Sequence, residues 1–127
     1  MGATTVWERW DSMLPDGTIN PGQMTSFNHY ALGAVADWMH RVIVGISPTE
    51  PGYRAVRIAP RPGGGITWAK GSLRTRHGVV AVSWQAGENG RLDVTVTVPD
   101  GVTAEVDVPG AAPARLAAGE HTISGQC

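Results

Sequence analysis

Residues 92–98 read Leu92-Asp93-Val94-Thr95-Val96-Thr97-Val98, and this alternation decides the fold class. Successive side chains of a β-strand point to opposite faces, so the Leu and Val residues make one apolar face and the Asp and Thr residues a polar one. The pattern predicts a strand that is buried on one side and wet on the other, as is typical of antiparallel sheets.

Similar short runs lie on both sides of this strand. They are separated by turn signals such as His77-Gly78 and Pro99-Asp100-Gly101, at the spacing of about eight to twelve residues that indicates an antiparallel sandwich. We therefore predict a mostly β protein in which residues 48–127 form an antiparallel β-sandwich. The expected strands are 53–59, 66–76, 79–85, 92–98, 102–108 and 121–124, with a Pro/Gly/Ala loop before the last one.

Residues 26–46 have the periodicity of a helix instead. Apolar side chains at steps of three and four form one stripe that includes Trp38 and Val42, Ser26 is a plausible N-cap, and Pro48 stops continuation. A lone helix has little to bury such a stripe against. We expect Trp38 to be buried and the stripe to need a partner, and the simplest account is that the chain is the C-terminal end of a larger protein with more of this helical domain. If the chain folds alone, we expect the stripe to pack against the sheet or a second copy, or the N-terminal third to be ill-ordered.

The stretch Trp7-Glu8-Arg9-Trp10-Asp11 concentrates more chemistry than any other. A carboxylate beside apolar rings is where a general acid or base is usually tuned, and an indole is a flat platform for the C–H face of a sugar. The alternative is structural, with Glu8 paired to an arginine and the indoles packed in a core. Residues 12–25 contain two Pro/Gly turn signals and are predicted to form a loop.

Composition excludes several classes of function. The length of 127 residues suits one ordinary domain. A net charge of −1 with 17% charged residues lacks the excess of basic residues that binds nucleic acid or an anionic membrane. No run of about 18 apolar residues could span a bilayer. The single cysteine, Cys127, can form no internal disulfide and indicates no compartment, and the four scattered histidines lack zinc spacing. We expect no metal and no cofactor.

Several separated motifs resemble the C-terminal end of bacterial α-L-rhamnosidases, the inverting glycoside hydrolases of family 78. The likeness covers essentially all of the chain from Ala3 onward, and it is most specific in the first 65 residues. The motifs are Thr4–Asp11, Ser26–Ala31, Gly33-Ala34-Val35 with Asp37-Trp38, and Pro51–Gly65, which looks like the junction between the catalytic and final domains of these enzymes.

The resemblance implies an architecture. In this family the catalytic domain is an (α/α)6 barrel, and a β-sandwich follows it. Residues 1–47 would then be the C-terminal end of the barrel and residues 48–127 the sandwich that packs on it. The rest of the barrel would be the partner of the apolar helix stripe.

The resemblance also implies roles for single residues. Glu8 corresponds to the general base that activates water, His29 to a sugar-binding histidine near the same pocket, and Trp7 and Trp10 to walls of the site. The family's general acid lies in an earlier, Asp/Glu-rich motif that has no counterpart here. We therefore expect the parent enzyme to hydrolyse terminal α-L-rhamnosyl bonds with inversion, and the isolated chain to be inactive.

The alternative function is a non-catalytic module. Residues 48–127 could form an independent carbohydrate-binding sandwich or a purely structural one. Trp68 and Trp84 lie in predicted strands, where they are either sugar-stacking residues or, as is the default for aromatic residues in sheets, buried. Gly63-Gly64-Gly65 lacks the Lys-Ser/Thr of a phosphate-binding loop and is predicted to be a turn.

Overall fold

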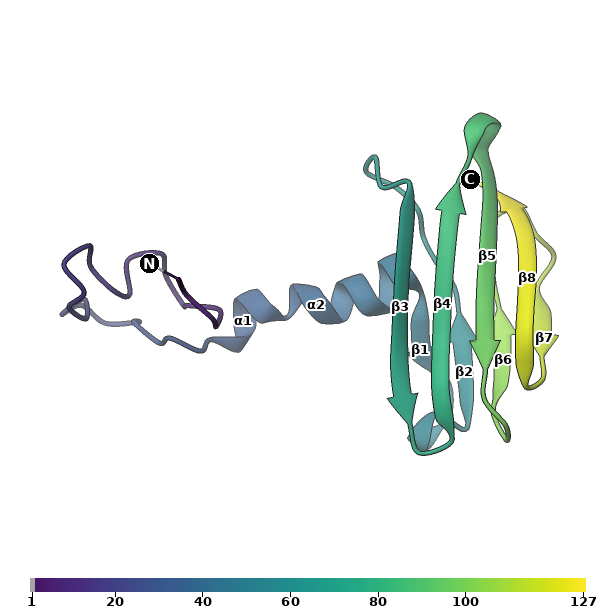
Figure 1. Ribbon diagram of the computed structural model, residues 1–127, viewed down its shortest axis with the longest axis horizontal. Helices are drawn as coiled ribbons and strands as arrows, with labels where there is room; N and C mark the ends of the chain where they lie inside the picture. The colour runs from purple at the N-terminus through teal and green to yellow at the C-terminus, as the bar shows by residue number, and fades with distance from the viewer. Residues whose placement is uncertain (1) are drawn as a thin grey trace. The chain divides into compact units, whose positions relative to one another are not determined.

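The computed structural model describes residues 2–127, apart from the side chain of Leu32. Its contacts separate two compact units, Met1–Trp38 and Met39–Cys127. Most of the regular structure lies in the second unit, where two sheets face each other (Figure 1). None of the helices in the described part of the chain is long and apolar enough to cross a membrane.

The second unit is a sandwich of two four-stranded sheets, so the predicted mostly β class is confirmed. Strand pairs are antiparallel except for β2 and β6, which run parallel with Ala55 opposite Thr103. The first sheet has the order β1 (Ile46–Pro48), β2 (Ala55–Ile58), β6 (Thr103–Val106), β7 (Ala114–Leu116). The second has the order β3 (Trp68–Thr75), β4 (Gly78–Ala86), β5 (Arg91–Val98), β8 (Gly119–Gln126). Short 3₁₀ turns at Pro51–Tyr53 and Glu88–Gly90 precede β2 and β5.

The core lies between the two sheets. Strand β5 buries its Leu and Val residues completely or almost so, while Asp93, Thr95 and Thr97 alternate with them and stay half-buried. Each fully buried Val or Leu side chain contributes about 1.5–3 kcal/mol relative to its exposed state. The buried hydrophobic residues are Ile43, Val44, Ile46, Val56, Ile58, Val80, Val82, Trp84, Leu92, Val94, Val96, Val98, Val102, Ala104, Val106 and Val108.

A short π-helix, η1 (Met39–Val44), opens the second unit and packs on β3. Strand β3 admits it because residue 71 is glycine: a Cβ there would lie 2.9 Å from a Val44 methyl group. Gly45 then ends η1 with a φ of +88°, and a Cβ at this position would lie 2.3 Å from the backbone nitrogen of Pro60. Glycine at both positions therefore lets η1 approach the sandwich closely.

In the first unit, turns precede two short helices, α1 (Tyr30–Gly33) and α2 (Val35–Trp38). Met13 and Ile19 form an isolated antiparallel bridge around Pro15-Asp16-Gly17, and the Asp16 carboxylate accepts hydrogen bonds from the backbone and hydroxyl of Thr18. The prediction of a loop with tight turns over residues 12–25 is confirmed.

The helical segment differs from the single helix predicted over 26–46. Helix α1 begins at Tyr30, and His29 is its N-cap because its Nδ1 accepts from the Ala31 amide; Ser26 is not the cap. Ala34 interrupts the helix, and η1 replaces its last part. Trp38 is 50% exposed, contrary to the prediction that it is buried. Helix α2 buries none of its residues, so its apolar stripe stays uncovered in this chain.

Further differences lie in the sandwich. Ile46, predicted to be helical, starts β1, where Pro48 is tolerated because β1 is a sheet edge. Strand β7 lies in the segment that was predicted to be a Pro/Gly/Ala loop. Trp84 is 3% exposed and belongs to the core, which confirms the expectation that aromatic residues in sheets are buried. Trp68 is 61% exposed, so the same expectation is wrong for it.

Candidate active site

Two backbone hydrogen bonds bring the ends of the N-terminal loop together. The amide of Glu8 donates to the carbonyl of Ser26 at 2.8 Å, and the amide of His29 donates to the carbonyl of Val6 at 2.8 Å. The Thr5 hydroxyl adds a bond to the Phe27 carbonyl. Residues that are about twenty positions apart in the sequence therefore lie side by side.

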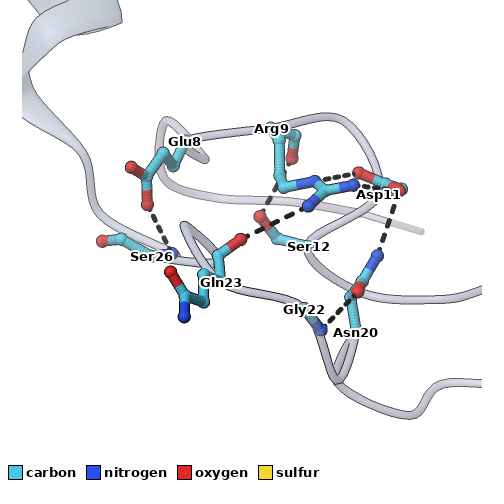
Figure 2. A network of polar contacts seen from close by, with 8 residues as sticks. All are labelled: Glu8, Arg9, Asp11, Ser12, Asn20, Gly22, Gln23 and Ser26. Carbon is cyan, nitrogen blue, oxygen red and sulfur yellow. Dashed lines mark hydrogen bonds and ion pairs between the residues drawn. The ribbon is translucent and has the colours of Figure 1, made fainter.

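Glu8 is held at both of its carboxylate oxygens. Oε2 accepts the backbone N–H of Ser26 at 3.1 Å (Figure 2), and Oε1 lies 3.4 Å from Nε2 of His29. The side chains of Glu8 and His29 are only 15% and 31% exposed. The two residues that the sequence singled out as base and sugar ligand thus form one half-buried pair.

The hydrogen bonds of His29 define its tautomer. Nδ1 accepts from the Ala31 amide at 3.3 Å, which requires a lone pair on Nδ1 and places the proton of the neutral ring on Nε2. Nε2 is the atom that faces Glu8, so the imidazole presents a donor to the carboxylate. The ring also stacks on Tyr30 at a centroid distance of 5.5 Å and an interplanar angle of 7°.

Arg9 and Asp11 belong to a separate, structural network (Figure 2). The guanidinium donates through both Nε and Nη2 to Asp11, the latter at 2.8 Å, and Asn20 donates to the same carboxylate at 3.0 Å. The hydrogen bond and charge of Arg9 hold the pKa of Asp11 below its usual value. Nη1 of Arg9 reaches the Gln23 carbonyl. This network fixes the loop that follows Glu8.

A hollow of about 570 Å³ lies beside Glu8, within the size range of small-molecule sites. Trp7, Glu8 and Trp10 all line it, together with Gly2, Ala3, Thr5, Val6 and Arg9. The Trp7 ring is fixed edge-on against Phe27, with centroids 5.1 Å apart and planes at 88°. Trp10 is 96% exposed and is free to meet a ligand. The structure therefore gathers Trp7, Glu8 and Trp10 around one cavity, and His29 joins them through Glu8.

The arrangement suits proton transfer at the edge of an apolar cavity. An oriented carboxylate can take a proton from water, and flanking indoles can bind the C–H face of a ring. No group of three or more His, Cys, Asp or Glu side chains that could hold a metal ion occurs among the residues that the structure describes. The site as seen is one of carboxylate, imidazole and indole groups.

Ser26 is the site residue whose role sequence reasoning missed. Its position before the periodic run indicates an N-cap, but its backbone amide anchors Glu8 and its hydroxyl accepts from the Asn28 amide. Backbone contributions of this kind carry no residue-type signal, because any non-proline residue supplies an N–H.

Comparison with known proteins gives two domain matches that together cover almost the whole chain. Residues 45–123 match the bacterial alpha-L-rhamnosidase C-terminal domain. Residues 1–43 match the bacterial alpha-L-rhamnosidase 6 hairpin glycosidase domain. The change of domain thus falls close to the boundary between the two compact units.

Individual relatives agree with these matches. An alpha-L-rhamnosidase of Streptomyces avermitilis is 47% identical over 121 residues, which are 95% of this chain and 11% of that protein. Among solved structures, the native enzyme from Aspergillus terreus gives a TM-score of 0.84 at 43% identity, over 98% of this chain and 15% of that one. The Streptomyces avermitilis enzyme complexed with L-rhamnose gives 0.81 at 40% identity, over 98% and 14%. The chain therefore spans only a small part of the length of these relatives.

Proposed function

The chain belongs to the bacterial α-L-rhamnosidases, and on this premise we propose that its first unit supplies the general base and part of the sugar pocket for inverting hydrolysis of terminal α-L-rhamnosyl bonds. The observation that carries the proposal is the Glu8–His29 pair, with Oε1 and Nε2 3.4 Å apart at the side of an indole-lined hollow. In this proposal the first unit belongs to the end of the helical barrel, and the second unit, whose first strand β1 begins at Ile46, forms the sandwich that supports it.

Glu8 is assigned the role of general base. Inverting hydrolysis needs one carboxylate that deprotonates water and one carboxylic acid that protonates the leaving oxygen, about 6.5–9.5 Å apart. The Ser26 amide and the His29 ring fix the plane of the Glu8 carboxylate, while each oxygen keeps a further lone pair for water. A fixed carboxylate can hold the attacking water in line with the anomeric carbon.

His29 is assigned to a sugar hydroxyl. Its 3.4 Å contact with Glu8 is longer than a good hydrogen bond, so the Nε2–H group can donate to a hydroxyl of the bound sugar as well as facing Glu8. The cap on α1 keeps Nδ1 occupied and prevents the ring from exchanging its two nitrogens. Trp7, fixed by Phe27, and the exposed Trp10 are assigned to the walls that meet the C–H faces of the sugar.

The general acid is assigned to neither Asp11 nor Asp16, the two aspartates that lie between Glu8 and α1 in the first unit. A general acid has to be protonated at the working pH. Arg9 lowers the pKa of Asp11, and hydrogen bonds from Thr18 lower the pKa of Asp16, so both groups stay ionised. We infer that the acid comes from a part of the enzyme that these residues do not include.

A chimaera tests the assignment. This chain replaces the 121 aligned residues of the Streptomyces avermitilis enzyme, and hydrolysis of an aryl α-L-rhamnoside is followed. Glu8→Gln should lower kcat at least about a hundredfold, because general-base catalysis contributes about 10²–10⁴. His29→Ala should raise KM, and NMR should show β-L-rhamnose as the first anomer formed.

The matched control is Asp16→Asn, which changes a carboxylate of the same unit that Thr18 holds outside the proposed pair. It should leave kcat and KM unchanged. Full kcat in the Glu8→Gln chimaera, with the melting temperature preserved, would refute the role of Glu8. A first product with the α configuration would refute inversion.

A further inference from the structure

The outer face of the sheet β3–β4–β5–β8 carries an ordered set of side chains that the proposed hydrolysis does not use. The strand register places Trp68 opposite Gln85, and Gln85 opposite Asp93. One row further along, Lys70 lies opposite Ser83, and Ser83 opposite Thr95. Because side chains alternate between faces, these residues all project away from the core.

Two adjoining hollows lie on this face, of about 430 Å³ and about 320 Å³. Lys70, Ser83 and Thr95 line both, so the hollows form one groove across the strands. The first hollow adds the hydroxyl groups of Ser72 and Thr97. The second adds the indole of Trp68, the amide of Gln85 and the carboxylate of Asp93.

Trp68 is the aromatic platform of this groove. Its side chain is 61% exposed on an edge strand, whereas Trp84 of the neighbouring strand is buried in the core. An indole whose face is open beside amide and hydroxyl groups offers stacking for the C–H face of a pyranose and hydrogen bonds for its hydroxyls. A groove of this kind has the chemistry of a sugar-binding site.

The charges of the groove select the kind of sugar. Asp93 is already engaged, since Arg91 and the Ser124 hydroxyl donate to its carboxylate. Lys70 forms no ion pair with any residue that the structure describes. Arg74 of β3 and Glu120 of β8 share this face but line neither hollow. The groove therefore offers one uncommitted cation and no uncommitted carboxylate.

We propose that this groove binds an acidic oligosaccharide, with one pyranose ring stacked on Trp68 and the carboxylate of a neighbouring uronic acid residue paired with Lys70. Trp68 and Lys70 are two residues apart on β3, a spacing of about 7 Å along the strand, so adjacent sugar residues can reach both groups. The site lies in the sandwich and is independent of Glu8 and His29.

A stacking ring beside a cation can also bind single-stranded nucleic acid. Such sites follow the phosphate backbone with a continuous basic groove, whereas this groove has one uncommitted cation in a chain of net charge −1. The carboxylate of a single uronic acid residue fits this charge better than a run of phosphates does.

Titration of the 127-residue chain with α-1,4-trigalacturonate, followed by calorimetry, tests the proposal. Its methyl ester is the matched ligand, because it keeps the rings and removes the charge. The acid should bind about two- to fivefold tighter than the ester, the range for an exposed ion pair. Trp68→Ala should weaken both ligands at least about fivefold, as expected for loss of a stacking partner. Lys70→Met should abolish the difference between acid and ester.

Two control variants test whether the effects are specific to the groove residues. Trp38→Ala removes another exposed indole and Arg54→Gln another exposed cation. Neither residue lines the groove, and both variants should bind like the parent chain. Circular dichroism checks that each variant folds. The proposal is wrong if neither ligand shows saturable binding, if binding survives Trp68→Ala, if acid and ester bind equally, or if a thymidine oligonucleotide binds more tightly. Loss of binding on His29→Ala but not on Trp68→Ala would place the ligand in the first unit, and would also refute it.

Discussion

The indole N–H of Trp84 donates a hydrogen bond of 2.7 Å to the backbone carbonyl of Ile43, which lies 41 residues earlier in the chain. The carbonyls of the last helical turn lack partners within the helix. Here the core of the sandwich supplies one of these partners, and both residues are buried. The Trp84 indole therefore fastens the end of η1 to strand β4.

Trp84→Phe should destabilise the second unit by about 2–4 kcal/mol, because it leaves a small cavity and a buried carbonyl without its donor. Urea unfolding followed by far-UV circular dichroism measures this loss. Trp68→Phe is the matched control, and it should stay within about 0.5 kcal/mol of the parent because Trp68 is exposed. Equal stability of the two variants would show that the bond to Ile43 contributes nothing.

Gly45→Ala should prevent the second unit from folding or destabilise it by more than about 4 kcal/mol, well beyond ordinary substitutions. The new Cβ would lie 2.3 Å from the Pro60 nitrogen and 2.6 Å from the Ala59 carbonyl carbon, which are backbone atoms that cannot turn away. Gly64→Ala separates the clash from the backbone strain. Gly64 also has a positive φ, of +61°, but no atom within 4 Å of its Cβ position, so it should cost only about 1–2 kcal/mol. The melting temperatures of both variants, compared with that of the parent chain, measure the two losses of stability.

Asp107 should stabilise the sandwich at neutral pH and lose that effect in acid. Arg57 and Arg61 each donate to Oδ2 at 2.6 Å, and these bonds, that of Arg57 first, lower the pKa of Asp107 in the folded state. A carboxyl with a lowered folded pKa stabilises the protein above its unfolded pKa of about 3.9, and the contribution disappears as the pH falls through the folded pKa.

The stability gap between the parent and Asp107→Asn should therefore be constant between about pH 5 and 7 and should narrow below about pH 4. Because Asp107 and Arg57 are both exposed to solvent, this difference in stability should be no more than about 1 kcal/mol and should decrease in high salt. Urea midpoints across this pH range measure it, with Asp100→Asn at an exposed turn as the control. A gap that widens in acid would contradict the assignment.

The purified 127 residues alone should show no hydrolysis of an aryl α-L-rhamnoside. Inversion needs an acid besides Glu8, and Asp11 and Asp16 are ionised and held by Arg9 and Thr18. Release of the chromophore over a long incubation is the measurement, with the active chimaera as the positive control. Turnover that disappears in Glu8→Gln would show that this chain contains both members of the catalytic pair.

The sandwich could be predicted where side chains alternate with period two. Strand β5 follows the predicted range within one residue, because its polar and apolar positions never break the pattern. The alternation also distinguishes the exposed Trp68 from the buried Trp84. Trp68 shares its face with Lys70 and Ser72, whereas Trp84 shares its face with Val80 and Val82. Strand β7 could not be predicted, since Ala114–Leu116 is too short to show a period.

Other features depend on distant contacts that no local pattern encodes. The change from α-helix to η1 and the parallel pairing of β2 with β6 are set by packing against the rest of the sandwich. In the candidate site, only the family resemblance predicted that Glu8 and His29 lie close together. The backbone bonds Glu8–Ser26 and His29–Val6 that create it involve groups that every residue carries.

The parallel pairing of β2 with β6 also constrains how the sandwich is assembled. The hairpin of β3 and β4 and its extension by β5 join neighbours in the chain and can form early. Val56 has no partner in β6 until the chain has been synthesised as far as Ala104, so the first sheet closes late. Until then the apolar faces of β4 and β5 lack their cover, and this interval is when the nascent chain is most exposed to aggregation.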